Sequence, residues 1–114
     1  MNVEVGISKN LEPAFHEAMR NIYKRANAEY HYNATRFLQL VTDQGGLRAA
    51  QILLKPGSVS DGLMRLWKES RLDISMEALV QQEPWRRLFT TEELSIAYKR
   101  LLDLGYVVEW PRDV

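Results

Sequence analysis

Apolar residues recur at every third or fourth position along almost the whole chain, and this spacing constrains the fold most. The longest run holds seven apolar residues between positions 11 and 30: Leu11, Phe15, Ala18, Met19, Ile22, Ala26 and Tyr30. Side chains three and four positions apart share one face of an α-helix, so the run predicts a helix from about residue 10 to about residue 30. Ser8 or Asn10 can cap its start, and Pro13 would lie in the first turn, where a missing N–H costs little.

Two shorter helices are predicted between residues 33 and 54. The first begins at Asn33, whose side chain can accept a hydrogen bond from the following turn, and it ends at Gly45-Gly46, since glycine tolerates the left-handed conformation after a helix. Its apolar face holds Phe37, Leu38, Leu40 and Val41. The next helix stops at Lys55-Pro56-Gly57 and carries Leu47, Ala50, Leu53 and Leu54.

A fourth and a fifth helix are predicted from capping residues that precede apolar ones. The stretch from Ser58 to Asp61 offers two caps for a helix whose inward residues are Leu63, Leu66 and Trp67. Asp73 or Ser75 opens the fifth helix, which carries Met76, Leu79 and Val80.

The last predicted helix has the strongest start signal. Pro84-Trp85 begins a single short turn that runs through Leu88 and Phe89. Thr90 then caps the final helix, with Glu93 reaching back to the backbone in a capping box. This helix ends at Gly105.

These elements predict an all-α fold: a compact bundle of about five to six helices, several of them short. The 114 residues match one domain, so residues 1–114 are predicted to share a single core. Residues 1–9 and 106–114 are expected to be extended tails. Within them, Val3–Ile7 and Tyr106–Trp110 are the two strand-like runs, which would either pair or pack on the helices.

Composition excludes several classes of site. The chain has no cysteine, which rules out disulfides, thiol catalysis and cysteine-bound metals. Glu12 and His16 stand one helical turn apart but lack a clear third ligand, so no metal and no cofactor are predicted. Asp73 and Glu77, next to Arg71, are interpreted as a cap and a local ion pair. With no secretory signal and no apolar stretch near the 20 or so residues that span a bilayer, a cytoplasmic protein is expected.

A series of short motifs is spread over the chain from Tyr32 to Tyr106. These motifs are Tyr32-Asn33-Ala34-Thr35-Arg36-Phe37-Leu38, Gly45-Gly46, Ser60-Asp61-Gly62-Leu63, Leu66-Trp67, Arg71-Leu72-Asp73, Glu77-Ala78-Leu79-Val80, Leu88-Phe89-Thr90 and Glu93-Leu94. With them, this part of the chain resembles a family of small uncharacterised bacterial proteins. The resemblance implies a bacterial, phage or mobile-element origin. It implies no activity, ligand or catalytic residue.

An uneven distribution of charge supports one functional hypothesis, binding of nucleic acid. The whole chain is neutral, yet residues 20–71 carry nine basic and four acidic residues, a net charge of +5. The same segment reads as helix, turn, short helix, turn, helix, which is compatible with a helix-turn-helix. The candidate nucleic-acid-binding residues are Arg48, Lys55, Arg65, Lys68 and Arg71.

The other hypothesis, which we favour from the sequence, is a non-enzymatic protein-interaction module. Three tryptophans and five tyrosines are many for this length. Aromatic residues beside arginines are typical anchors of protein interfaces, so the candidate interface residues are Trp85, Arg86, Arg87 and Trp110. A homodimer through the first helix, where Tyr23 and Ala28 lie off the main apolar stripe, is an allowed form of this interaction.

Overall fold

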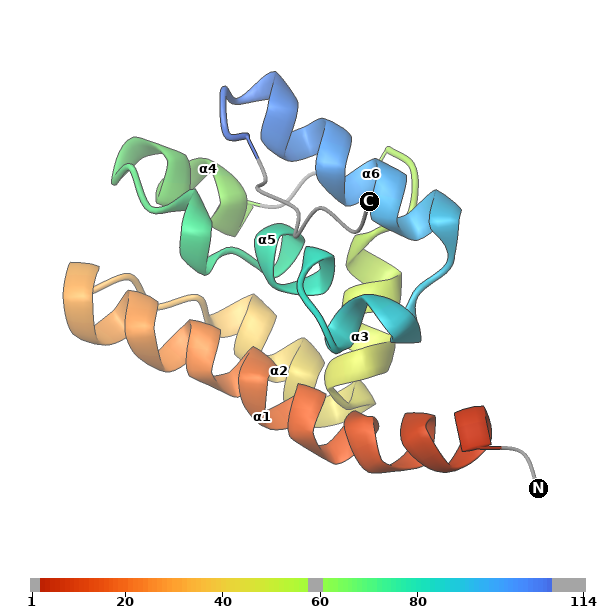
Figure 1. Ribbon diagram of the computed structural model, residues 1–114. Helices are drawn as coiled ribbons and strands as arrows, with labels where there is room; N and C mark the ends of the chain where they lie inside the picture. The colour runs from red at the N-terminus through yellow and green to blue at the C-terminus, as the bar shows by residue number, and fades with distance from the viewer. Residues whose placement is uncertain (1–2, 58–60, 108–114) are drawn as a thin grey trace.

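The computed structural model describes residues 3–57 and 61–107, with side chains described over 11–57 and 62–107. In these residues the chain is all-helical, as predicted, and contains no strand (Figure 1). The elements in chain order are α1 (Val3–Tyr30), α2 (Thr35–Gln44), α3 (Gly46–Leu53), α4 (Asp61–Lys68), the 3₁₀-helix η1 (Leu72–Ile74), α5 (Met76–Gln81), the 3₁₀-helix η2 (Trp85–Leu88) and α6 (Thr91–Asp103). None of these helices combines the length and apolarity needed to cross a membrane.

Helix α1 begins seven residues earlier than predicted, at Val3. The expected extended segment over residues 1–9, with its strand-like run Val3–Ile7, is therefore wrong from Val3 onward. Ser8 and Asn10 lie inside the helix rather than capping it, and so does Pro13. Local β preference is a weak force, and adding residues to an existing long helix needs no new nucleus, which explains the difference.

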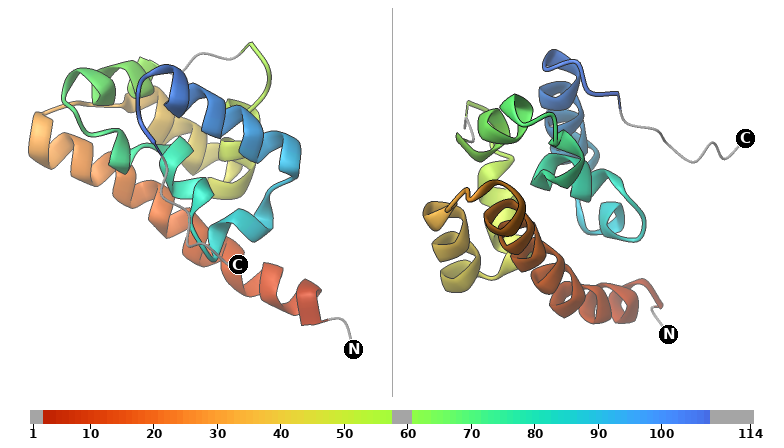
Figure 2. Two further views of the ribbon diagram at one scale, coloured as in Figure 1. Left: turned by 45° about the horizontal axis from the view of Figure 1, so that its top comes forward. Right: turned by 90° about the vertical axis from the view of Figure 1, so that its left-hand side faces the viewer.

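The helices form two layers (Figure 1). Helices α1, α2 and α3 pack against one another in the first layer, and α5 and α6 pack together in the second. Helix α4 lies in the second layer and contacts η1, while η1 and η2 both reach α1. The same division is visible from the side (Figure 2).

Two clusters of buried apolar side chains form the core. The first joins both layers and contains Phe15, Met19, Val41, Ala49, Ala50, Leu54, Met76, Val80, Phe89 and Ala97. The second lies toward the end of α1 and contains Ala26, Leu63, Leu66, Leu72, Ile74, Ala78 and Leu101. Helices α1, α5 and α6 contribute to both clusters, so they tie the two parts of the core together.

Trp67 was predicted to point inward and does not: 45% of its surface is exposed. Its neighbours Leu63 and Leu66 are buried as predicted. Helix α4 has eight residues and buries only a narrow stripe, so a side chain beside that stripe stays in solvent.

The predicted helix ends are mostly confirmed. The Ser75 hydroxyl accepts from the Ala78 N–H, and Thr90 and Glu93 form the complete capping box at the start of α6. Gly45, at φ +85°, ends α2. Tyr106 and Val107 are neither helix nor strand, and the rest of the predicted tail, 108–114, lies outside the described residues.

Candidate functional site

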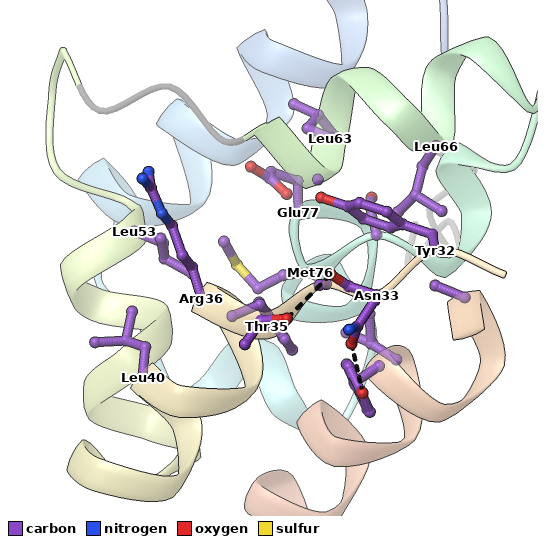
Figure 3. Close-up of a pocket in the computed structure, with 17 residues that line it drawn as sticks. Tyr32, Asn33, Thr35, Arg36, Leu40, Leu53, Leu63, Leu66, Met76 and Glu77 are labelled. Carbon is purple, nitrogen blue, oxygen red and sulfur yellow. Dashed lines mark hydrogen bonds between the residues drawn. The ribbon is translucent and has the colours of Figure 1, made fainter.

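A pocket of about 430 Å³ opens between the two layers (Figure 3). It lies where α2 and the α1–α2 connection face α4 and α5. Its lining residues are Ile22, Tyr23, Ala26, Tyr32, Asn33, Ala34, Thr35, Arg36, Phe37, Leu40, Leu53, Gly62, Leu63, Leu66, Ser75, Met76 and Glu77. Pockets of this size, mostly apolar with a few polar groups, are typical binding sites.

The walls of the pocket are made by apolar side chains from both layers. Leu63, Leu66 and Met76 are buried and belong to the core clusters. Phe37 and Leu40 are half-buried, so part of each remains uncovered. The pocket therefore offers apolar surface on which an apolar group would gain free energy by leaving water.

Glu77 is the buried polar group of this pocket. Only 1% of Glu77 is exposed, and burial raises the pKa of its carboxyl, against the opposing effects of a backbone hydrogen bond and of Arg100. The Arg100 Nη1 donates to Glu77 Oε2 at 3.2 Å. Arg100 also donates to the carbonyl oxygens of Leu53 at 2.7 Å and Lys55 at 3.1 Å. The Glu77 carboxyl is thus paired with Arg100, and the Arg100 guanidinium also binds carbonyl oxygens at and after the end of α3.

Hydrogen bonds hold the rim of the pocket in place. The Tyr23 hydroxyl donates to Asn33 Oδ1 at 2.8 Å (Figure 3). The Tyr32 N–H donates to the Ala26 carbonyl at 3.2 Å. Asn33 was predicted to cap α2, and this is wrong: Ala34 precedes the helix, without a side-chain cap. The Asn33 side chain is used to join α2 to α1 instead.

Arg36 is the cation among the described residues that line the pocket. It stands in the first turn of α2, it is exposed, and its side chain extends away from the helix backbone (Figure 3). Among the side chains that the structure describes, none forms a hydrogen bond or an ion pair with Arg36. No acidic residue lies in the first turn of α2 to offset the charge.

Two hydroxyl groups that line the pocket are engaged in local hydrogen bonds. A hydrolytic site would need a nucleophile beside a general base. The Ser75 hydroxyl is already used, donating to the Leu72 carbonyl at 2.6 Å and accepting from Ala78. The Thr35 hydroxyl is turned to the Asn33 carbonyl at 3.4 Å.

Two of the five candidate nucleic-acid residues are engaged inside the molecule. Arg65 donates to Glu69 Oε1 at 3.0 Å and to the Tyr30 carbonyl at 3.1 Å, and its guanidinium lies 5.2 Å from the centre of the Tyr32 ring. Arg48, Lys55 and Lys68 are exposed; Arg48 lies on α3, Lys55 just after α3, and Lys68 at the end of α4.

Arg71 is held by several partners at once. It contacts Glu29 and Asp73 as ion pairs and donates to the Tyr30 hydroxyl at 2.9 Å. The Arg71 guanidinium is the main reason why the pKa of Glu29 and the pKa of Asp73 lie below their usual values. The predicted local pair of Arg71 and Asp73 is thus present, whereas Glu77 is not part of this cluster.

Among the candidate interface residues, Trp85 packs against the core. It is half-buried and packs on Phe15, with ring centres 5.6 Å apart. Arg87 is exposed and pairs with Glu83 at 3.0 Å, and Arg86 lies 4.0 Å from the same carboxylate. Trp110 lies outside the described residues. Trp85 therefore contributes part of its ring to the packing of the core.

His16 has a structural contact. Its Nδ1 accepts from the Gly46 N–H at 3.0 Å, which joins α1 to the start of α3. In the described part of the chain no three potential ligands come together as a metal site.

The pocket itself was not predicted. Its walls come from residues 22 to 77, and no motif links them along the chain. The one local signal was Arg36, a basic residue in the first turn of a helix where acidic residues are favoured.

The chain matches no family model, no curated protein and no solved structure. The resemblance to a family of small bacterial proteins therefore stays a prediction.

Proposed function

We propose that this chain is a non-enzymatic protein-interaction module and that its docking site is the pocket between α2, α4 and α5. One observation carries the proposal: an apolar pocket of about 430 Å³ whose rim is exposed and held by hydrogen bonds. Tight protein interfaces depend on a few anchor side chains that fill such pockets. A pocket formed before binding also lowers the ordering cost of association.

The proposed interface differs from the one that the sequence favoured. Trp85 is engaged with Phe15, so it is not available as an anchor without opening the core. The anchor is supplied instead by the partner, and this chain supplies the receptor. Cytoplasmic location remains part of the proposal, and a second copy of the chain is one possible partner to be tested.

Nucleic-acid binding is the weaker alternative. A recognition helix needs cations that are free to reach phosphates or base edges. Arg65 and Arg71 are both held by carboxylates of the same molecule. No contact in the described structure favours this function over the pocket.

Selection from a library of random peptides displayed on phage tests the proposal. We expect the protein to enrich peptides that share a large apolar residue. In wild-type protein labelled with ¹⁵N, the selected peptides should shift the amide signals of pocket residues such as Leu40 and Gly62. Leu53→Trp, which puts a larger side chain into the pocket, should abolish this binding, whereas Leu102→Trp on the exposed part of α6 should not.

Three results would count against the proposal. Peptides that bind Leu53→Trp as well as wild type, or that shift signals far from the pocket, would place the interface elsewhere. A small molecule found in the purified protein by native mass spectrometry and displaced by Leu53→Trp would make the pocket a small-molecule site. Light scattering that showed a dimer broken by the same change would instead agree with the proposal and identify a second copy as the partner.

A further inference from the structure

We infer that the segment which docks in this pocket carries a carboxylate beside its apolar anchor and that Arg36 binds this carboxylate. The inference rests on the proposed function, because it names the chemistry of the partner at that same pocket. It follows from the balance of charge around the pocket.

Of the described residues that line the pocket, two are charged, and they differ in burial and pairing. Glu77 is buried, and Arg100 pairs with it at 3.2 Å. Arg36 is exposed and has no pairing side chain among those that the structure describes. The pocket therefore presents one uncompensated positive charge to a ligand.

The surroundings of Arg36 add to this positive charge. Helix α2 has no side-chain cap and no acidic residue in its first turn. The start of a helix carries the positive end of its dipole, and here the dipole and the guanidinium lie at the same rim. An acidic group of a partner would meet both.

Docking of an apolar anchor alone would leave the Arg36 guanidinium with less water and no ion-pair partner. A partner segment that covers the pocket removes water from Arg36, and a cation that loses water without gaining a partner is unfavourable. A carboxylate supplies that partner, and a guanidinium can bind it through two parallel hydrogen bonds. Basic partners are rejected for the same reason, which makes Arg36 a residue of specificity as well as affinity.

The test compares the peptides selected by wild type, Arg36→Glu and Arg48→Glu. Wild type should enrich Asp or Glu at a fixed distance from the apolar residue. Arg36→Glu should keep the apolar residue and replace the acidic one by Lys or Arg. Arg48→Glu changes the net charge equally on an exposed residue of α3 that does not line the pocket, so it should retain the acidic preference.

Folding of Arg36→Glu is expected to be intact, because a carboxylate in the first turn of a helix is favourable. Circular dichroism checks this. For the best peptide, changing its acidic residue to the amide should weaken binding to wild type by roughly tenfold, the loss of one charge-assisted contact. The same change should have little effect on binding to Arg36→Glu.

The possible results separate the inference from the proposed function. Apolar peptides without acidic enrichment, or with enrichment unchanged in Arg36→Glu, would overturn the role of Arg36 and leave the docking site standing. Peptides unaffected by Leu53→Trp would remove the docking site and the inference with it. Acidic enrichment lost equally in Arg48→Glu would show a general charge effect and would also overturn the inference.

Discussion

Arg100 of α6 donates to the buried carboxyl of Glu77 in α5 at 3.2 Å, and the same guanidinium binds two carbonyl oxygens at and after the end of α3. One cation thus joins three segments behind the pocket. A helix end leaves carbonyl groups without partners, and Arg100 supplies donors to them. This arrangement makes the pair a structural support for the pocket wall.

Removing the cation should destabilise the fold strongly. Arg100→Met leaves the buried Glu77 carboxyl without its partner, and loss of one member of a buried pair costs about 3 kcal/mol. Urea unfolding measures this loss. Lys99→Met, on the exposed neighbour in α6, should change the unfolding free energy little.

A double substitution tests whether the charge on Glu77 causes that loss. Glu77→Gln combined with Arg100→Met should lose less than the sum of the two single changes, because no unpaired carboxylate remains. Additive losses would show that Arg100 acts only through the carbonyls of α3.

Stability should change with pH in opposite directions through two carboxyls, those of Glu77 and Glu29. Burial raises the pKa of Glu77 above the value of 4.5 expected for an unfolded chain. The protonated carboxyl of Glu77 therefore contributes to the stability of the folded state. This contribution is fully present below pH 4.5 and is lost as pH rises through the raised pKa. The unfolding free energy of wild type relative to Glu77→Gln should fall as pH rises from about 4.5.

Glu29 provides the matched control for this measurement. The hydrogen bond from Arg71 lowers the pKa of Glu29, so its contribution is present above pH 4.5 and is lost as pH falls through the lowered pKa. Stability relative to Glu29→Gln should therefore rise with pH in the acidic range. Equal slopes for the two comparisons would contradict the assigned shifts.

The substitution Gly46→Ala should destabilise the fold, although glycine to alanine normally stabilises a helix. Glycine to alanine inside a helix usually gains up to about 1 kcal/mol. At Gly46 an added Cβ would lie 2.6 Å from the Cα of His16, a backbone atom that cannot turn aside. Gly46→Ala should lose about 2 kcal/mol in chemical unfolding, as overpacking does. The loss should persist in a His16→Ala background, since the clash is with backbone.

Binding to DNA should be weak and depend little on these arginines. Arg65 and Arg71 are already paired with carboxylates, so few phosphate contacts are available. Fluorescence anisotropy with a short duplex should show no saturable binding at moderate salt. Tight binding that falls steeply with salt, and that is lost in Lys55→Ala or Lys68→Ala, would restore the nucleic-acid hypothesis.

Local signals along the chain predicted most helix boundaries. The capping box of Thr90 and Glu93 and the glycine at position 45 act over four residues or fewer, so the sequence displays them directly. The failed prediction at Asn33 came where a local preference met a tertiary contact. Asn33 is a good cap by type, but the hydroxyl of Tyr23 takes its oxygen at 2.8 Å.

The spacing of apolar residues and the capping residues predicted the helical class of this protein, a bundle of about five to six helices and most of the helix ends. These depend on side chains three or four positions apart and on the residues that satisfy free backbone groups. The pocket, the pairing of Glu77 with Arg100 across 23 residues and the pairing of Glu29 with Arg71 across 42 residues arise from the way the helices pack together. A chain's periodicity shows which side of a helix is buried, but it does not show which other helix covers that side, and the pocket and both ion pairs depend on that choice.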